Sequence, residues 1–244
     1  MDLRLGDYRE VLADVVCQAI ICDPPYGQRT HQGQRTNRDG RFVKPGSSWV
    51  SERGLDYAHW TPDDVSAFVQ FWAPRCKGWF ACMTSHDLVP HWLAAYDAAG
   101  LYSFAPLAIV TPGSNIRLCG DGPSSWTVWL VVSRPKTMRA WGTLPGAYVF
   151  GHGGTQRKLN PVAGGKSPEL MQAIVRDYSR PGDLVCDPCA GGGTTLLAAV
   201  QTGRRAIGSE LDPITHAKAL KRLANTPVTT DLLDTLQAQQ MGLL

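Results

Sequence analysis

Short apolar runs alternate with amphipathic segments along this chain, a pattern typical of a mainly parallel β-sheet with helices on both faces. We expect a first strand at residues 3–5, a second at 19–22 and a third through 79–83. Residues 102–110 and 126–132 form two further β-rich runs around the polar stretch 113–125. The alternation predicts an α/β fold.

Helix starts are marked by cap residues. Thr61 followed by Pro62 predicts a helix over 62–72, and a further helix over 86–99 should end at Gly100. Ser167 and Pro168 open another helix, whose expected buried face is Leu170, Met171, Ile174, Val175 and Tyr178. Asp212-Pro213 repeats the start signal. The apolar residues that recur after it, and that we expect to pack against the sheet, are Ile214, Ala217, Leu220 and Leu223.

Composition agrees with one globular α/β domain over residues 1–244. The chain is 43% hydrophobic with a mean hydropathy of −0.16, and no window approaches the roughly 18 uninterrupted apolar residues of a membrane span. Its start lacks the pattern of a signal peptide, so we expect a cytoplasmic protein. The seven cysteines are an odd number within mostly apolar stretches, which favours reduced, buried thiols.

Asp23-Pro24-Pro25-Tyr26-Gly27 follows the apolar run 19–22 directly. The two prolines fix φ and make a stiff turn at the end of a buried strand. The Asp23 carboxylate and the Pro24 carbonyl can accept hydrogen bonds from a planar amine, while Tyr26 offers a ring for stacking. The alternative is an ordinary turn in which these residues only end the strand.

A second candidate site lies near the other end of the chain. A predicted strand reaches Asp187, a glycine loop follows over residues 190–194, and an apolar helical run continues to residue 200. The next apolar segment ends at Glu210, 19 positions after Gly191. That spacing suits a carboxylate that receives ribose hydroxyls.

The glycine loop does not match the common phosphate-binding patterns. It lacks the G-x-G-x-x-G spacing of dinucleotide enzymes, and the chain has no G-x-x-x-x-G-K-[ST] stretch. Hydride transfer and phosphoryl transfer are therefore disfavoured.

With Asp23-Pro-Pro-Tyr26, the loop 187–195 and the segment 208–213 together, the chain resembles the S-adenosylmethionine-dependent DNA amino-methyltransferases. The catalytic motif precedes the cofactor motif, as in the circularly permuted beta group of that family. The resemblance implies a Rossmann-like methyltransferase fold: a mainly parallel seven-stranded sheet with an antiparallel edge hairpin, and helices on both faces.

The same resemblance implies roles for individual residues. It implies that the catalytic residues are Asp23, Pro24, Pro25 and Tyr26. It implies that S-adenosylmethionine contacts Asp7, Lys166, Ser167, Asp187, Pro188, Ala190, Gly191, Gly193, Thr194, Thr195, Glu210 and Leu211. In the family, lysine and proline are usually adjacent, whereas Ser167 intervenes here after Lys166.

Cys186-x-x-Cys189 has the spacing of a metal or redox pair. No second pair supports that interpretation, and the histidines lack ligand spacing. Two small residues packed near the cofactor explain the spacing more simply, so we expect no metal.

Basic residues gather in stretches without a clear period. We expect residues 28–60 to form a basic, mobile loop that faces DNA, and residues 134–165 to form a small target-recognition region. The alternative for the first stretch is a solvated surface insertion. The expected DNA-binding residues are Arg29, Arg35, Arg38, Arg41, Lys44, Arg134, Lys136, Arg139, Arg157 and Lys158.

The resemblance implies an enzyme of bacterial or phage type that acts on double-stranded DNA. Asp at the first motif position favours adenine N6 as the target, with cytosine N4 as the alternative. A protein-glutamine methyltransferase would more naturally begin the motif with Asn, and a catalytically silent DNA-binding module is a further alternative. A short recognition region suggests a short target, a second subunit or weak specificity, so a homodimer stays open.

Overall fold

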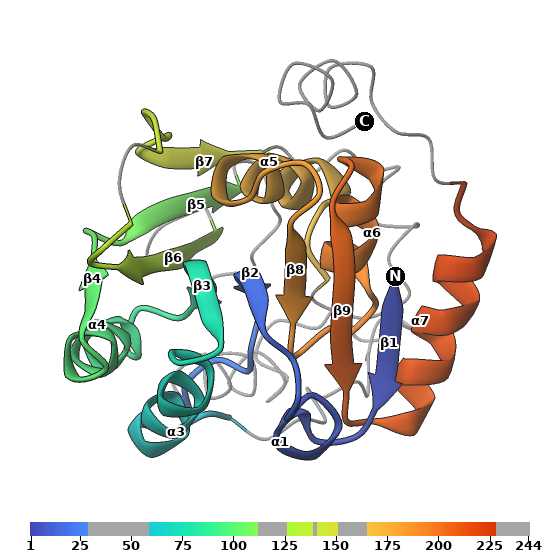
Figure 1. Cartoon of the computed structure of the whole chain (residues 1–244), viewed down its shortest axis with the longest axis horizontal. Helices are drawn as coiled ribbons and strands as arrows, with labels where there is room; N and C mark the ends of the chain where they lie inside the picture. The colour runs from blue at the N-terminus through green and yellow to red at the C-terminus, as the bar shows by residue number, and fades with distance from the viewer. Residues whose placement is uncertain (29–58, 112–125, 139–140, 151–164, 228–244) are drawn as a thin grey trace, which may run out of the picture.

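The computed structural model describes residues 1–28, 59–111, 126–138, 141–150 and 165–227. In these residues, nine strands form one sheet in the order β1-β9-β8-β2-β3-β6-β5-β7, and β4 pairs with β6. Figure 1 shows this sheet at the centre of the molecule. The strands are β1 (Asp2–Leu5), β2 (Cys17–Cys22), β3 (Cys76–Thr84), β4 (Leu101–Ser103), β5 (Leu107–Thr111), β6 (Trp126–Pro135), β7 (Ala147–Val149), β8 (Leu184–Asp187) and β9 (Arg205–Glu210).

The sheet is mainly parallel on one side and antiparallel on the other. β1, β9, β8, β2 and β3 are parallel neighbours, whereas β3, β4 and β5 each run antiparallel to β6. Strand β7 lies beyond β5 and is parallel to it. The parallel half therefore brings the carboxyl ends of β9, β8, β2 and β3 to one edge.

Helices cover both faces of the sheet (Figure 1). One face packs against α5 and α6, and the other against α1, α3 and α4. Helix α7 lies beside β1 and β9. The helices are α1 (Tyr8–Val11), α3 (Pro62–Trp72), α4 (Val89–Ala98), α5 (Pro168–Tyr178), α6 (Thr194–Gln201) and α7 (Pro213–Asn225).

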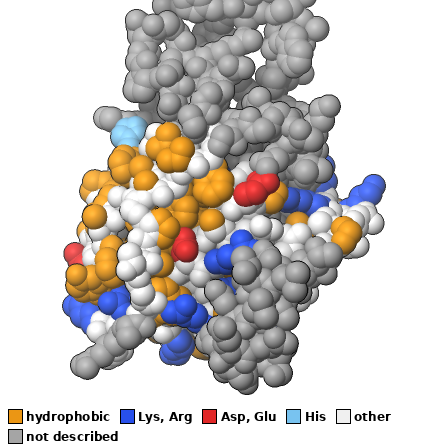
Figure 2. Space-filling model, turned by 90° about the horizontal axis from the view of Figure 1, so that it is seen from above, with side chains coloured by type: hydrophobic (Ala, Val, Ile, Leu, Met, Phe, Trp, Pro, Cys, Tyr) orange, Lys and Arg blue, Asp and Glu red, His pale blue; other side chains and the backbone are white. Residues whose placement is uncertain are grey.

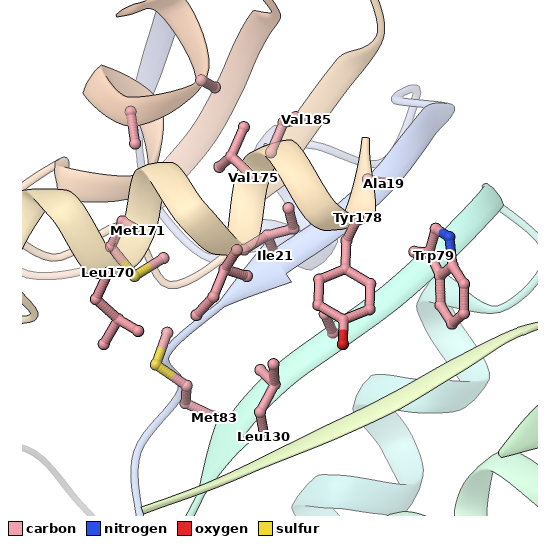
Figure 3. Packing of buried hydrophobic residues seen from close by; sticks show 14 of the residues in the cluster. Ala19, Ile21, Trp79, Met83, Leu130, Leu170, Met171, Val175, Tyr178 and Val185 are labelled. Carbon is pink, nitrogen blue, oxygen red and sulfur yellow. The ribbon is translucent and has the colours of Figure 1, made fainter. Parts of the chain in front are cut away.

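Successive side chains of the central strands point to opposite faces of the sheet and belong to two separate hydrophobic cores. In β2, Ala19 and Ile21 enter the core under α5 and α6, while Ile20 and Cys22 enter the core under α3 and α4. Figure 3 shows side chains of α5, among them Met171, packed toward those of the strands beneath. Both faces of the strand are thus buried, which explains its continuous apolar run.

The predicted α/β class is confirmed, with two additional strands. The run 102–110 divides into β4 and β5 because Pro106, between them, has no N–H for a ladder hydrogen bond. Residues 147–149 add β7 outside the predicted antiparallel pair. Over the described residues the sheet consequently has nine strands instead of seven, and β7 lies outside the antiparallel group.

The cap signals locate three helices. Thr61 caps α3 in a reciprocal capping box, while Ser167 caps α5 and Asp212 caps α7. All five expected core residues of α5 are buried. The predicted buried stripe of α7 is wrong: Ile214 is 64% exposed and Leu220 is 44% exposed, and Leu223 is the stripe residue that is buried.

The error in α7 has a geometric cause. Residues spaced by three turn 60° backward around a helix of 3.6 residues per turn at each step. Four of them therefore spread over half of the helix surface, and a helix at the edge of the sheet buries less than that.

Candidate active site

The turn after β2 brings a carboxylate and a phenol together. Tyr26 Oη donates a hydrogen bond to Asp23 Oδ1 at 2.7 Å. The Tyr26 side chain is buried among core residues, and its backbone carbonyl accepts a hydrogen bond from Trp60 N–H at 3.1 Å. Two prolines inside the turn restrict its backbone further. The residues of the predicted acceptor turn are thus held in one arrangement.

Two residues after β3 support the same turn. Gly27 N–H donates to Ser85 Oγ at 2.9 Å, and a Cβ at Gly27 would lie 2.2 Å from Asp87 Oδ2. In the part of the chain that the structure describes, the buried Oδ1 of Asp87 has no hydrogen-bond partner. Neither Ser85 nor Asp87 is among the residues predicted from the sequence. Their signal is the polar run that follows the apolar residues of β3.

The predicted glycine loop follows β8 and bends sharply. Gly191 has φ +51° and Gly193 has φ +75°, a left-handed region that favours glycine. A Cβ at Gly191 would meet no atom within 4 Å among the described residues, so the loop presents open space there. Gly193 N–H donates to the Ala190 carbonyl at 2.8 Å and closes the bend.

Glu210 is the acid at the end of the neighbouring strand β9. Its Oε2 accepts from Gly191 N–H at 2.9 Å and its Oε1 accepts from Asp212 N–H at 2.8 Å. Each carboxylate oxygen has two lone pairs, so both keep acceptor capacity for a hydroxyl group. The predicted spacing of 19 residues is thus a direct contact in the fold.

Strand register brings the two halves of the site to one edge. β2 pairs with β8 through Ile20 and Cys186, and β8 pairs with β9 through Asp187 and Gly208. Asp23 follows the last residue of β2 and Pro188 follows the last residue of β8, so the acceptor turn and the glycine loop leave the same edge of the sheet. Tyr26 and Ala190 also belong to the same buried cluster.

Asp187 is buried between these halves. The pKa of its carboxyl is raised to about 7, mainly by burial and to a smaller extent by the nearby charges of Asp23 and Glu210. Hydrogen bonds from the Thr195 side chain and from Cys189 N–H, the latter at 3.1 Å, oppose the rise. The three acids thus share one electrostatic environment, which favours a cationic ligand over a phosphate.

Lys166 contacts the predicted acceptor turn. Its Nζ forms an ion pair with Asp23 Oδ2 and lies 5.1 Å from the centroid of the Tyr26 ring. The next residue, Ser167, uses its Oγ to accept from Leu170 N–H at 3.2 Å as the cap of α5. The segment predicted to contact the cofactor therefore also contacts the acceptor turn.

The other predicted cofactor residues surround the glycine loop with different exposures. The Pro188 carbonyl accepts from Ser209 Oγ at 3.0 Å, Thr194 is buried at the start of α6, and Leu211 is 69% exposed. Asp7 caps α1, and its hydrogen bond from Arg9 lowers the pKa of its carboxyl. Because Leu5 pairs with Glu210, Asp7 lies near the same sheet edge.

Arg222 of α7 also contacts the loop and is not among the residues predicted from the sequence. Its Nη1 donates to the Gly192 carbonyl at 2.9 Å and to Thr194 Oγ1 at 2.8 Å. Burial lowers the pKa of this guanidinium. The sequence signal was weak, because a lysine and an arginine side by side in a helix usually mark a solvated face.

The described cysteines are free thiols. Cys186 is fully buried in β8, Cys189 is half-buried in the loop, and Cys22 Sγ lies 3.2 Å from Cys82 Sγ. Desolvation raises the pKa of the Cys189 thiol. Across the residues the structure describes, no group of three or more His, Cys, Asp or Glu side chains could hold a metal ion.

Most expected DNA-binding residues lie outside the described residues: Arg29, Arg35, Arg38, Arg41, Lys44, Arg139, Arg157 and Lys158. Of the two that are described, Lys136 is exposed. Arg134 instead lies over the rings of Trp79 and Phe104, 5.6 Å from each centroid. On the face drawn in Figure 2, basic and acidic side chains lie among hydrophobic ones.

The predicted recognition region 134–165 is described in part. Residues 147–149 form β7, and Trp141, Leu144 and Phe150 pack against the core under α5. The described helices include none long and apolar enough to cross a membrane.

Comparisons with known proteins find similarity to DNA methylases in the part of the chain that contains the glycine loop. Residues 149–221 match a family model described as DNA methylase. A DNA adenine methyltransferase of Escherichia coli (strain K12), YhdJ, is 40% identical over 58 residues, which are 24% of this chain and 20% of that protein. The type II methyltransferase M.MthZI of Methanothermobacter thermautotrophicus is 50% identical over 44 residues, 18% of this chain and 12% of that protein. The matched stretches span 24% or less of the length of the curated relatives.

Two solved structures share the fold over nearly the whole chain. A complex of M1.HpyAVI with SAM aligns with a TM-score of 0.67 at 18% identity, covering 92% of this chain and 99% of that one. The cytosine-N4-specific PvuII DNA methyltransferase aligns with a TM-score of 0.58 at 16% identity, covering 98% of this chain and 91% of that one. The fold is therefore Rossmann-like, as in these methyltransferases, and the family match supports an amino-methyltransferase.

Proposed function

We propose that this protein is a DNA methyltransferase that transfers a methyl group from S-adenosylmethionine to the exocyclic N6 amine of adenine in duplex DNA. The observation that carries the proposal is the meeting of two pairs at one sheet edge. The hydrogen-bonded pair Tyr26 and Asp23 lies in the turn after β2. The hydrogen bond between Gly191 and Glu210 links the loop after β8 to the end of β9, and these three strands are neighbours. A stiff amine acceptor thus lies beside a nucleoside-type loop.

The described residues fit the cofactor. Glu210 keeps acceptor capacity for ribose hydroxyls, the bend at Gly191 leaves open space, and the acids around Asp187 complement a positive charge. When bound, S-adenosylmethionine supplies an activated methyl group on a sulfonium. The remaining predicted contacts, including Asp7, Ser167 and Leu211, would surround it.

The acceptor turn provides the other half of the reaction. The target base leaves the duplex and stacks on Tyr26, while Asp23 and the Pro24 carbonyl accept hydrogen bonds from its amine. An aryl amine is a poor nucleophile because its lone pair is delocalised into the ring. Holding both N–H groups turns that lone pair out of conjugation and toward the methyl group, and Asp23 then accepts the proton that the nitrogen releases.

Direct transfer agrees with the residues present. No covalent enzyme intermediate is required, because the amine nitrogen itself is the nucleophile. The described thiol nearest the turn in sequence, Cys22, is buried, and desolvation raises its pKa. Its role is therefore packing.

An Asp23→Ala variant tests the catalytic assignment. It should keep cofactor binding, measured by calorimetry with S-adenosylhomocysteine, and lose methyl transfer to duplex DNA. Activity equal to that of the parent would remove Asp23 from the mechanism. A parent that binds DNA without methylating it would favour the catalytically silent module.

The choice of adenine rests on Asp23 as the first residue of its motif. Cytosine N4 is the alternative, and the fold is shared with the cytosine-N4-specific PvuII enzyme. Nucleoside mass spectrometry of treated DNA should detect N6-methyladenine, and N4-methylcytosine alone would contradict this choice. Sequencing methylated positions in DNA from expressing cells would identify the recognition sequence.

We further propose the circularly permuted arrangement, a DNA-facing role for residues 28–60 and target recognition by residues 134–165. The order of the motifs supports the first, and clustered basic residues support the others. Comparing parallel assays with duplex DNA and with glutamine-containing peptides would separate the proposed substrate from a protein substrate.

A further inference from the structure

Both carboxylate oxygens of Asp23 are already engaged within the protein. Oδ1 accepts from the Tyr26 hydroxyl, and Oδ2 pairs with the Lys166 ammonium. The two charged side chains are largely shielded from solvent, with 16% of Lys166 and 26% of Asp23 exposed. Lys166 therefore makes a partly desolvated, charge-assisted contact with the proposed amine acceptor.

The lysine ammonium resembles the target amine in its interactions. Both are N–H donors, both can bind Asp23 Oδ2, and both can lie against the ring of Tyr26, from whose centroid Nζ is 5.1 Å distant. A base stacked on that ring with its amine on Asp23 needs the positions that Lys166 takes.

We propose that Lys166 is an internal competitor of the target amine, which must be displaced from Asp23 before the base can bind. This inference rests on the proposed function. In the protein without substrate, Lys166 balances the charge of a half-buried carboxylate. Oδ2 keeps a second lone pair, but the ammonium occupies the position on Oδ2 next to the Tyr26 ring, where the amine of a stacked base would bind. During base binding, the lysine side chain leaves that position so that the amine can take it.

Local geometry allows this displacement without a change in fold. Ser167 fixes the backbone beside Lys166 as the cap of α5, while the lysine side chain has four rotatable carbons. Rotation of the side chain is therefore enough. Because the ammonium must be displaced, every base binds the site more weakly than it would without Lys166. A base whose amine takes the place of the ammonium on Asp23 loses the least affinity.

The family resemblance implies a different role, in which Lys166 contacts the cofactor. The two roles predict opposite effects on DNA binding when the cation is removed. Loss of a cation near DNA ordinarily weakens binding, because fewer phosphate counterions are released. Loss of a competitor strengthens it.

The test uses Lys166→Met and a duplex that carries the recognition sequence found by sequencing methylated DNA. Affinity is measured by fluorescence anisotropy at fixed salt without any cofactor, so that the measurement does not depend on activity. We expect Lys166→Met to bind this duplex roughly tenfold more tightly than the parent, since a charge-assisted hydrogen bond no longer opposes the amine.

A second duplex isolates the amine. It carries purine, which lacks the exocyclic amine, in place of the target adenine, and the gain in affinity should disappear. Lys166→Arg, which keeps the cation, should bind both duplexes like the parent. Lys166→Gln provides a second neutral side chain if the methionine variant is unstable, and Lys218→Met on the exposed side of α7 is the matched control for loss of one charge.

The outcomes are separable. The proposed competition is contradicted if Lys166→Met binds the adenine duplex no tighter than the parent does. It is also contradicted if the increase in affinity is equally large for the purine duplex. A parent that methylates no DNA contradicts the proposed function instead. Weaker binding of S-adenosylhomocysteine with unchanged DNA affinity would assign Lys166 to the cofactor.

Discussion

Tyr26 Oη donates to Asp23 Oδ1 at 2.7 Å within a turn of four residues. The phenol thus orients the carboxylate, while the ring provides the surface for stacking. Tyr26→Phe separates these roles because it removes the hydroxyl and keeps the ring. We expect kcat for methyl transfer to fall about tenfold, in line with the loss of one hydrogen bond to a charged group.

Tyr26→Ala removes both roles and should reduce transfer much further. Cofactor affinity should stay at the parent value in both variants, and calorimetry with S-adenosylhomocysteine checks this. Equal kcat for Tyr26→Phe and the parent would mean that the hydroxyl does not position Asp23.

Glu210 provides the second prediction. Glu210→Gln removes a charge and turns an N–H donor toward either Gly191 N–H or Asp212 N–H, both of which now donate to the carboxylate. Cofactor affinity measured by calorimetry should fall by about 10 to 100-fold, while DNA affinity is retained. Glu10→Gln, on the exposed face of α1, is the matched control and should bind cofactor like the parent.

The sequence predicts best those features that depend on local contacts. Thr61 with Pro62 and Ser167 with Pro168 determine where α3 and α5 begin, because a cap satisfies backbone N–H groups within one turn. The acid spaced 19 residues from Gly191 is predictable for a similar reason. After the bend, one short helix and one short strand return the chain to the same edge of the sheet, and in this type of fold that takes about 20 residues.

Features that depend on distant segments were not predictable. The contact of Lys166 with Asp23 joins residues 143 positions apart, and its partner is decided by where α5 packs. The contacts of Asp87 and Arg222 were not predictable for the same reason, because each residue belongs to an element far from its partner in the sequence. The exposed residues of α7 show the same limit, since a hydrophobic stripe does not reveal how much of a helix its neighbours cover.

Asp187 should make stability depend on pH. Its carboxyl has a pKa of about 7 in the folded protein, against 3.8 for an ordinary aspartate, so the folded state keeps a proton that the unfolded chain releases. Stability should therefore fall as pH rises from about 4 to about 7, and this contribution should be constant above that. The full shift corresponds to roughly 4 kcal/mol as an upper bound.

Asp187→Asn removes the titration, so its free energy of unfolding relative to the parent should rise between pH 5 and pH 8. Urea denaturation at several pH values measures the difference. Asp63→Asn, at the exposed start of α3, controls for the loss of a carboxylate. A constant difference between Asp187→Asn and the parent over this range would contradict a raised pKa.

Gly27 has no side chain because Asp87 takes the space. A Cβ at Gly27 would lie 2.2 Å from Asp87 Oδ2 and 2.8 Å from its Cγ, which is a severe overlap with a short side chain. Gly27→Ala should lower the free energy of unfolding by about 1 to 3 kcal/mol and displace the turn that holds Asp23 and Tyr26. Adding Asp87→Ala removes the obstacle, so the double variant should recover most of that loss. Gly146→Ala, where a Cβ would meet nothing within 4 Å among the described residues, is the matched control and should unfold like the parent in urea. If the double variant is no more stable than Gly27→Ala alone, backbone conformation and not Asp87 requires the glycine.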